Sequence, residues 1–555
     1  MKKYNLFKVI GITIAVVWVL TLFVPSSFLD YSGKVTTNSV NGVGIFGLLS
    51  NLSISISYFN GIALFLIAVA GFYAIVNKLD VYERFVSNTV NLFKNKKGLF
   101  VTISVIFFGI LACLVKDAMI LIMFMPFIYQ VMKRLEIDKK VILSSTIVAT
   151  LIGAMCGIYD STLFSMFNLE LNTLLLVKII ILILSLAALI FFTAPRKESV
   201  PAKKETKKQT KAETKKSQTK KVSKKEKKVN KVVYAILTIL FGCIGINKFY
   251  AGKIKAGILS IVFCWTFIPF ILSVAEFITV LTEAADKDGK IPVNSVRREN
   301  VAFAVCLCLF VIFAVSVVIP WESLINKFKV FTDFNTWLAG LKIKDYAVVG
   351  NIIGSPVVTD SATGTTNGVI NVIGNWSLSD MSILLFIITL IIGICKNIKI
   401  DDFISSVTKG VKDVLPVAIT AMLISIVLVI SVTTGINITI TNWIISLTKG
   451  FNIVTYTLAS IIGSVITADF YYFVSTICSI FTGAVTDKNL YGVIALLVQS
   501  VYYLTMIIAP TSVGLVIGLY YLDIPYTKWC KYIWKVLLSL FVIVMLATII
   551  VFVLV

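Results

Sequence analysis

The sequence contains no histidine. Imidazole metal ligands, histidine proton relays and catalytic pairs that need a histidine base are therefore excluded. The nine cysteines include no C-x-x-C pair, so neither a zinc site nor a disulfide framework is indicated. No nucleophile–base pair, metal cluster or phosphate-binding loop stands out either. We therefore expect a protein that is not an enzyme and has no cofactor or metal centre.

Charge is also scarce, since 14% of the residues are charged and 58% are hydrophobic. In soluble domains, about a quarter of the residues are charged. Apolar runs of about 20 residues recur, which is the length a helix needs to cross the hydrocarbon core of a bilayer. The expected fold class is an all-α polytopic membrane protein with roughly 12–14 membrane segments, some of them broken or re-entrant helices.

The net charge of +23 is unevenly distributed. Residues 196–231 contain 16 Lys and Arg and 4 Glu, so this segment carries about half of the net charge of the chain. This segment has no apolar periodicity, so it is predicted to be a disordered cytoplasmic linker and not a nucleic-acid-binding domain. Two roles stay open for it: a solvated tether, or a contact with anionic lipid of the inner leaflet.

Basic loops set the expected topology. The first apolar span, residues 6–25, is interpreted as a membrane helix and not as a cleaved signal peptide. The basic loops at 94–98 and 133–140 fall on one side, which the positive-inside rule assigns to the cytoplasm together with the N-terminus and the linker. Residues 27–57 are nearly uncharged and are expected to form an external loop, and residues 321–379 mirror them. The protein is thus predicted to lie in the cell membrane.

Two distant stretches share one layout. Lys97 precedes Asp117 by 20 residues, and Lys449 precedes Asp469 by the same interval. In each stretch the aspartate follows an apolar helix at the point where the chain turns back. Two halves with broken helices in corresponding positions are typical of secondary transporters. Two unrelated hairpins stay the alternative, because apolar sequence aligns easily with itself.

A polar break follows each of these aspartates, after 43 residues in the first stretch and 41 in the second. A carboxylate within the membrane costs several kcal/mol unless it is solvated or paired, so it indicates a functional site by default. Na⁺ or H⁺ as a coupling ion would bind near Asp160 or Asp469, where unwound backbone supplies carbonyl oxygens. Helix caps at a membrane surface are the alternative interpretation. The predicted substrate- or ion-binding residues are Asp117, Gly157, Asp160, Ser161, Thr162, Asp469, Pro510, Thr511 and Ser512.

Residues 232–281 are expected to be a separate module. The segment resembles the family of small two-transmembrane-helix (TM2) domains, in which spaced glycines, an aromatic pair and a glycine turn join two helices. Such glycines allow close helix approach. The resemblance also assigns polar positions to Asn247 and Glu276, and it implies a fold more than an activity. The matching positions are Gly242, Gly245, Phe249, Tyr250, Gly252 and Gly257.

The phrase from Phe403 to Ala418, with Gly410, Asp413 and Pro416, resembles one that opens a scaffold helix in a family of carriers. The family contains basic-amino-acid antiporters and anaerobic four-carbon dicarboxylate carriers (the YfcC-like and DcuC-like branch of the ion transporter superfamily). Ala509-Pro510-Thr511-Ser512 is similar to its C-terminal break. The resemblance covers residues 1–195 and 300–555, which we interpret as the two transporter halves. Lys409, Lys412 and Asp413 are interpreted as a helix start at the inner face.

The resemblance implies an inverted repeat and an ion-coupled secondary carrier, symporter or antiporter, of a small amino acid or carboxylate. The sequence departs from the family's acidic phrase, because Leu114 to Ala118 reads LVKDA where paired glutamates are usual. A membrane scaffold or sensor that recruits a partner through the linker and the two-helix module is the alternative. Association of copies of the chain into a homo-oligomer also stays open.

Overall fold

The computed structural model describes residues 2–30, 34–158, 161–169, 174–195, 228–262, 264, 268–282, 285–293, 296–325, 328–343, 346–347 and 373–555. The chain forms two compact units. Unit one comprises Met1–Lys78, Val86–Ala194 and Phe313–Val555, and unit two comprises Leu79–Phe85 and Pro195–Ile312. Most of the expected linker, residues 196–227, lies outside the described residues.

Helices dominate the described residues, and the strands form only short two-stranded hairpins. Several shorter apolar helices accompany the long ones. The expected all-α polytopic fold is confirmed. Seven of the described helices are long and apolar enough to cross a membrane: Phe59–Val76, Lys97–Leu114, Leu175–Thr193, Leu378–Cys395, Ile400–Thr434, Lys488–Met506 and Tyr526–Leu554.

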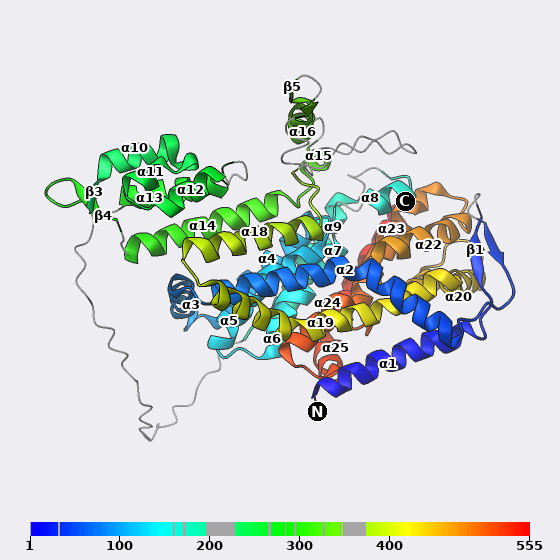
Figure 1. The fold of residues 1–555 in the computed structure, drawn as a ribbon. Helices are drawn as coiled ribbons and strands as arrows, with labels where there is room; N and C mark the ends of the chain where they lie inside the picture. The colour runs from blue at the N-terminus through cyan, green and yellow to red at the C-terminus, as the bar shows by residue number, and fades with distance from the viewer. Residues whose placement is uncertain are drawn as a thin grey trace, which may run out of the picture. The chain divides into compact units, whose positions relative to one another are not determined.

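Helices α2 (Ile45–Val76) and α19 (Ile400–Thr434) run side by side, as the blue and yellow ribbons of Figure 1 show. Gly410 makes this close approach possible, because a Cβ there would lie 2.8 Å from the carbonyl oxygen of Ala70. The expected external loop at 27–57 is therefore wrong for residues 45–57, which are helical. Ser55 is buried there, and its hydroxyl does not need water, since Ser55 Oγ donates to the Met422 carbonyl at 2.8 Å.

The segment that was expected to mirror that loop, residues 321–379, also contains helices. α15 (Trp321–Leu324) and α16 (Val330–Gly340) occupy its first part, whereas residues 348–372 lie outside the described residues. Helix α18 (Leu378–Cys395) begins at a capping box in which Ser377 Oγ accepts from the Asp380 backbone N–H. α18 packs on α2.

The first half of unit one contains two interrupted helices and a closing helix. α4 ends at Leu114, and the chain restarts as the 3₁₀ helix η1 and α5. The next helix is continuous from Lys139 to Met155 and consists of α6, the π-helical turn η2 and α7. After a second break, the chain forms the short helix α8 and then the long helix α9. Their bounds are α4 (Lys97–Leu114), η1 (Ala118–Phe124), α5 (Met125–Arg134), α6 (Lys139–Leu143), η2 (Ser144–Val148), α7 (Ala149–Met155), α8 (Ser161–Met166) and α9 (Leu175–Thr193).

The second half repeats this order after α20 (Ile436–Ser446). The short helix behind each second break packs into the opposite half. Leu163 of α8 joins the buried cluster around Phe473, and a Cβ on Gly518 of α24 would lie 2.4 Å from the Leu143 side chain. The two halves therefore interlock. The bounds are α21 (Ile453–Ile466), α22 (Phe470–Gly483), α23 (Tyr491–Met506), α24 (Val513–Leu522) and α25 (Tyr526–Leu554).

Unit two contains the expected two-helix module. Strands β3 (Lys228–Asn230) and β4 (Lys290–Pro292) pair and flank its helices, so the expected linker ends earlier than predicted. The backbone of β3 finds its hydrogen bonds in β4, and the Asn230 side chain caps the next helix. The helices are α10 (Lys231–Phe241), α11 (Ile246–Tyr250), α12 (Ile254–Val262) and α13 (Ile268–Thr282), with the 3₁₀ turn η3 (Gly242–Ile244).

The polar residues of this module meet in its interior. Asn247 Nδ2 donates to Glu276 Oε2 at 3.1 Å and to Thr238 Oγ1 at 3.0 Å, and the Tyr234 hydroxyl donates to Glu276. Gly257 leaves room for the ring of Phe249, since a Cβ there would lie 2.6 Å from that ring. The spaced glycines thus serve helix packing, as expected from the sequence.

Candidate functional site

Asp117 and Asp469 occupy corresponding positions in the two halves. Each caps the helix that restarts after a break: an Asp117 oxygen accepts from the Met119 N–H at 2.8 Å, and an Asp469 oxygen from the Tyr472 N–H at 3.0 Å. Both side chains are partly buried. The electrostatic influence of Asp469 reaches Asp117. Two carboxylates that are 352 residues apart in sequence therefore lie in the same region of unit one.

The second break of the first half, which separates α7 from α8, lies against the end of α4. The Ile158 N–H donates to the Cys113 carbonyl at 3.2 Å, and Cys113 Sγ contacts the Cys156 carbonyl at 3.2 Å. Gly157 lies within this break, as predicted. Asp160 lies outside the described residues, whereas Ser161 and Thr162 are the first residues of α8.

The second break of the second half, which separates α23 from α24, contains Pro510, Thr511 and Ser512. Thr511 is 1% exposed, and its hydroxyl has no hydrogen-bond partner among the described residues. Ser512 is the N-cap of α24, yet its side chain makes no capping hydrogen bond. A Cβ on Gly514 would lie 3.6 Å from the Met119 sulfur, so the start of α24 adjoins the helix that Asp117 caps. The breaks of the two halves therefore converge.

A buried pair that the sequence reasoning missed links this region. Lys178 of α9 is 2% exposed and Gln499 of α23 is 1% exposed. Lys178 Nζ lies 2.6 Å from Gln499 Oε1 and 3.0 Å from the Gly157 carbonyl oxygen, and 4.6 Å from the centroid of the Phe164 ring. Gln499 Nε2 donates to the carbonyls of Ala154 and Gly157 at 3.2 Å. A lysine within the apolar run LLLVKIIILIL was the available signal.

The equivalent position in the second half is an aromatic residue. Lys178 is the fourth residue of α9, and Trp529 is the fourth residue of α25. Trp529 Nε1 donates to the Ile507 carbonyl at 3.0 Å, and the Tyr526 hydroxyl donates to the Ile508 carbonyl. The first turn of the closing helix thus satisfies carbonyls at the break in both halves.

A polar helix face lies next to the Asp469 cap. Ser460, Gly463 and the C-cap residue Thr467 lie on one side of α21. This side contacts α20, since a Cβ on Gly463 would lie 3.3 Å from Asn437 Oδ1. Asn437 Nδ2 and Ser460 Oγ are buried and have no partner among the described residues. These atoms provide hydrogen-bonding capacity that the described part of the chain leaves unused.

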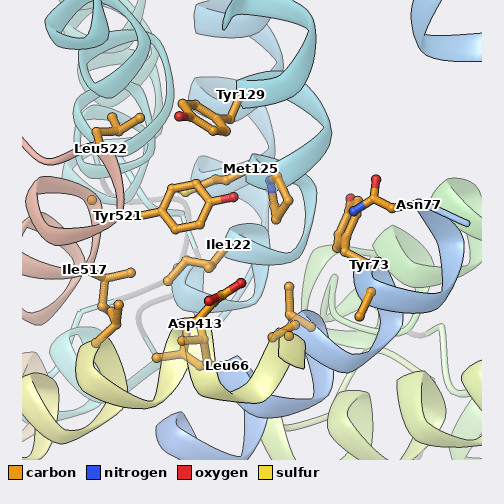
Figure 2. Close-up of a pocket in the computed structure, with 18 of the residues that line it drawn as sticks. Leu66, Tyr73, Asn77, Ile122, Met125, Tyr129, Asp413, Ile517, Tyr521 and Leu522 are labelled. Atoms are coloured by element: carbon orange, nitrogen blue, oxygen red, sulfur yellow. The ribbon is translucent and has the colours of Figure 1, made fainter. Parts of the chain in front are cut away.

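A cavity of about 430 Å³ lies between the α2–α19 pair and the elements η1, α5 and α24. Figure 2 shows Asp413 of α19 below the ring of Tyr521, with Tyr129 above it. The two tyrosine rings meet edge to face, with their centroids 5.1 Å apart. The interpretation of Lys409 and Asp413 as a helix start is wrong, because α19 begins at Ile400 and both residues line the cavity.

Comparison with known proteins adds the family. Residues 348–553, which contain α18 to α25, match the family model of the C4-dicarboxylate anaerobic carriers. This region is therefore similar to that family of carriers. The resemblance seen in the phrase from Phe403 to Ala418 is thereby confirmed. The match points to a transporter, and the matched region includes both breaks of the second half.

The module of unit two also has relatives. Residues 227–278 match the model of the TM2 domain. A stretch of 50 residues is 53% identical to the uncharacterized membrane protein YozV of Bacillus subtilis (strain 168), and covers 9% of this chain and 63% of that protein. The chain is therefore a multi-pass membrane protein with one region similar to these carriers and another similar to TM2 domains.

Proposed function

We propose that this protein is an ion-coupled secondary carrier of a small carboxylate. The observation that carries the proposal is the convergence of the broken helices, with Asp117 and Asp469 as paired caps. The name of the matched family adds the substrate class, a four-carbon dicarboxylate. Amino acids, which also carry a carboxylate, form the second substrate class to be tested.

The substrate would lie beside the second break. The first backbone N–H groups of α24 have no side-chain cap, and helix N-termini attract carboxylates. The buried hydroxyl of Thr511 offers one further donor at the same break. Together they supply hydrogen bonds for one carboxylate group without a buried arginine.

The coupling ion would bind between the two aspartates. Two neighbouring, partly buried carboxylates repel each other, and a proton or Na⁺ between them relieves this repulsion. Buried polar atoms without a partner among the described residues also lie on α20 and α21, at Asn437 and Ser460, and α21 ends three residues before Asp469. Binding of the ion would therefore change the charge next to the substrate position, which is the physical basis of coupling.

The cavity supplies the route of access. Its lining includes Asn77 and Lys78, which follow the end of α2 and are close in sequence to the basic loop at 94–98 that the positive-inside rule assigns to the cytoplasm. Its walls come from the α2–α19 pair on one side and from η1 and α24 on the other. Movement of the elements that carry the breaks along this pair would open and close the route, as alternating access requires.

Flux into liposomes tests the proposal. The purified full-length chain is reconstituted, and uptake of labelled succinate, fumarate and a panel of amino acids is measured under Na⁺ and proton gradients. We expect saturable uptake of a dicarboxylate that depends on one of the gradients. No flux of any of these solutes would contradict the carrier and favour the scaffold alternative, for which the inserted TM2 domain is the structural argument.

A further inference from the structure

The cavity of unit one has the size of a small-molecule site. Its volume of about 430 Å³ lies in the range of ligand pockets, about 300–1,000 Å³. Among the described residues that line it, Asp413 is the only acidic one. Most of the lining is apolar, and Figure 2 shows four of these side chains together with Asp413: Leu66, Ile122, Met125 and Ile517.

Most other polar side chains of the lining already have partners within the protein. Lys78 Nζ, for example, donates to the Asp402 carbonyl at 3.2 Å. The carboxylate of Asp413 differs, because it forms no hydrogen bond and no ion pair with the described part of the chain. The polar side chains with partners are Tyr73, Asn77, Lys78, Thr146 and Ser406.

Lys409 is the nearest cation along the helix, one turn of α19 before Asp413. Side chains four residues apart are neighbours on a helix. No ion pair joins these two in the described structure, and both residues are exposed. The negative charge of Asp413 therefore remains accessible to a ligand in the cavity.

Two tyrosine rings lie on the other side of the carboxylate. Figure 2 shows Asp413 below the ring of Tyr521, with Tyr129 above it. Lys133 Nζ lies 5.7 Å from the centroid of the Tyr129 ring, so that ring already has a cation beside it. Tyr521 is 45% exposed, and no cation of the described residues lies over its ring. A carboxylate next to such a ring is suited to an ammonium group, since its oxygens accept N–H bonds and the ring attracts the charge.

We propose that this cavity binds a primary amine with an apolar body, whose ammonium group contacts the Asp413 carboxylate and the ring of Tyr521. The apolar body would fill the space along the apolar lining. A dicarboxylate is repelled by Asp413, so this site is distinct from the carboxylate position at the second break of the second half. Because the cavity is also the proposed route of access, a bound amine would inhibit transport. This last consequence rests on the carrier function proposed above, whereas the binding itself does not.

Calorimetric titration of the purified full-length chain in detergent tests the binding. The probes are isoamylamine, isoamyl alcohol and isocaproate, which share a branched apolar body and differ in charge, and protein-free micelles are the blank. We expect the amine to bind about tenfold more tightly than the alcohol, and isocaproate not to compete with it.

Substitutions locate the site. D413N should weaken amine binding about tenfold, whereas D402N should leave it unchanged, because Asp402 is an exposed aspartate of the same helix outside the lining. Y521L should weaken it about threefold, and Y521F, which keeps the ring, should not. Asp413 and Tyr521 are both exposed, so these variants should fold, and thermal unfolding of each verifies this.

Three results overturn the proposal: no binding of the amine, binding of the alcohol or of isocaproate as tight as that of the amine, or equal amine affinity of D413N and D402N. None of these measurements needs transport. Failure of the amine to bind therefore leaves the carrier function intact, and absence of flux in liposomes leaves this site intact. Where uptake is measurable, the amine should inhibit D402N more strongly than D413N.

Discussion

Lys178 Nζ lies 2.6 Å from Gln499 Oε1, in the interior of the protein and 321 residues away along the chain. The contact joins α9 of the first half to α23 of the second. Gln499 in turn donates to the carbonyls at the end of α7, so one glutamine fixes three elements from both halves. The break at the end of α7 is therefore held by residues of both halves. A substitution at this point in one half should destabilise the other half as well.

Removal of Gln499 should destabilise the protein. Q499A would leave Lys178 without one of its oxygen partners and the end of α7 without a donor, a loss of about 2–3 kcal/mol in the free energy of unfolding. Q130A is the matched control, since Gln130 is only partly buried and donates to the exposed Asn77, and it should change stability by less than about 0.5 kcal/mol. Denaturant unfolding in detergent measures both, and equal effects would contradict the role of the buried glutamine.

The paired aspartates should be required for transport through their charge. D117N and D469N retain a good helix cap, because Asn caps as well as Asp, but remove the carboxylate. We expect uptake to fall about 10–100-fold in each, with unchanged expression. The control is D487N, which alters an exposed aspartate that caps η5 (Lys488–Leu490) through the Asn489 N–H. Uptake by D117N and D469N at the level of D487N would rule out this site.

Close packing of α4 against α7 should depend on glycine at position 153. A Cβ there would lie 2.2 Å from the Gly109 carbonyl oxygen, which is backbone and cannot turn away. G153A should therefore cost about 1–3 kcal/mol. In G483A, the new Cβ would meet no atom within 4 Å, so this variant should be neutral or more stable by about 0.5–1 kcal/mol. Unfolding midpoints decide, and a G153A variant as stable as G483A would refute this packing.

The TM2 unit contains a pair that should respond to acid. Lys228 Nζ lies 2.9 Å from Asp286 Oδ2, and this hydrogen bond lowers the pKa of Asp286 from its usual 3.8. A lowered pKa in the folded state means that the pair stabilises above the ordinary pKa and that this contribution is lost as the pH falls through the lowered one. K228A should return the pKa toward 3.8 in an NMR titration, whereas K287A should not. Equal titration of both variants would exclude the pair as the cause.

Much of the architecture could be predicted from local pattern. Composition determined the membrane fold, the equal spacing from Lys97 to Asp117 and from Lys449 to Asp469 indicated the repeated halves, and the glycine spacing identified the two-helix module. These features could be predicted because each depends on residues that are close together in the chain. Caps such as Asp117 and Asp469 belong to this class, since an aspartate bonds to an N–H only two or three residues away.

Other features depended on partners that no local pattern names. Residues 45–57 are helical and pack with the rest of α2 on α19, where Ser55 donates to a carbonyl 367 residues away in sequence. Asp413 reads as a charge at a helix start, and only the packing of α2, α19 and α24 makes it part of a cavity wall. Lys178 appeared as one unexplained charge in an apolar run. Its partners include a glutamine in the other half and a carbonyl at a break, and such contacts decide whether a buried charge is tolerated.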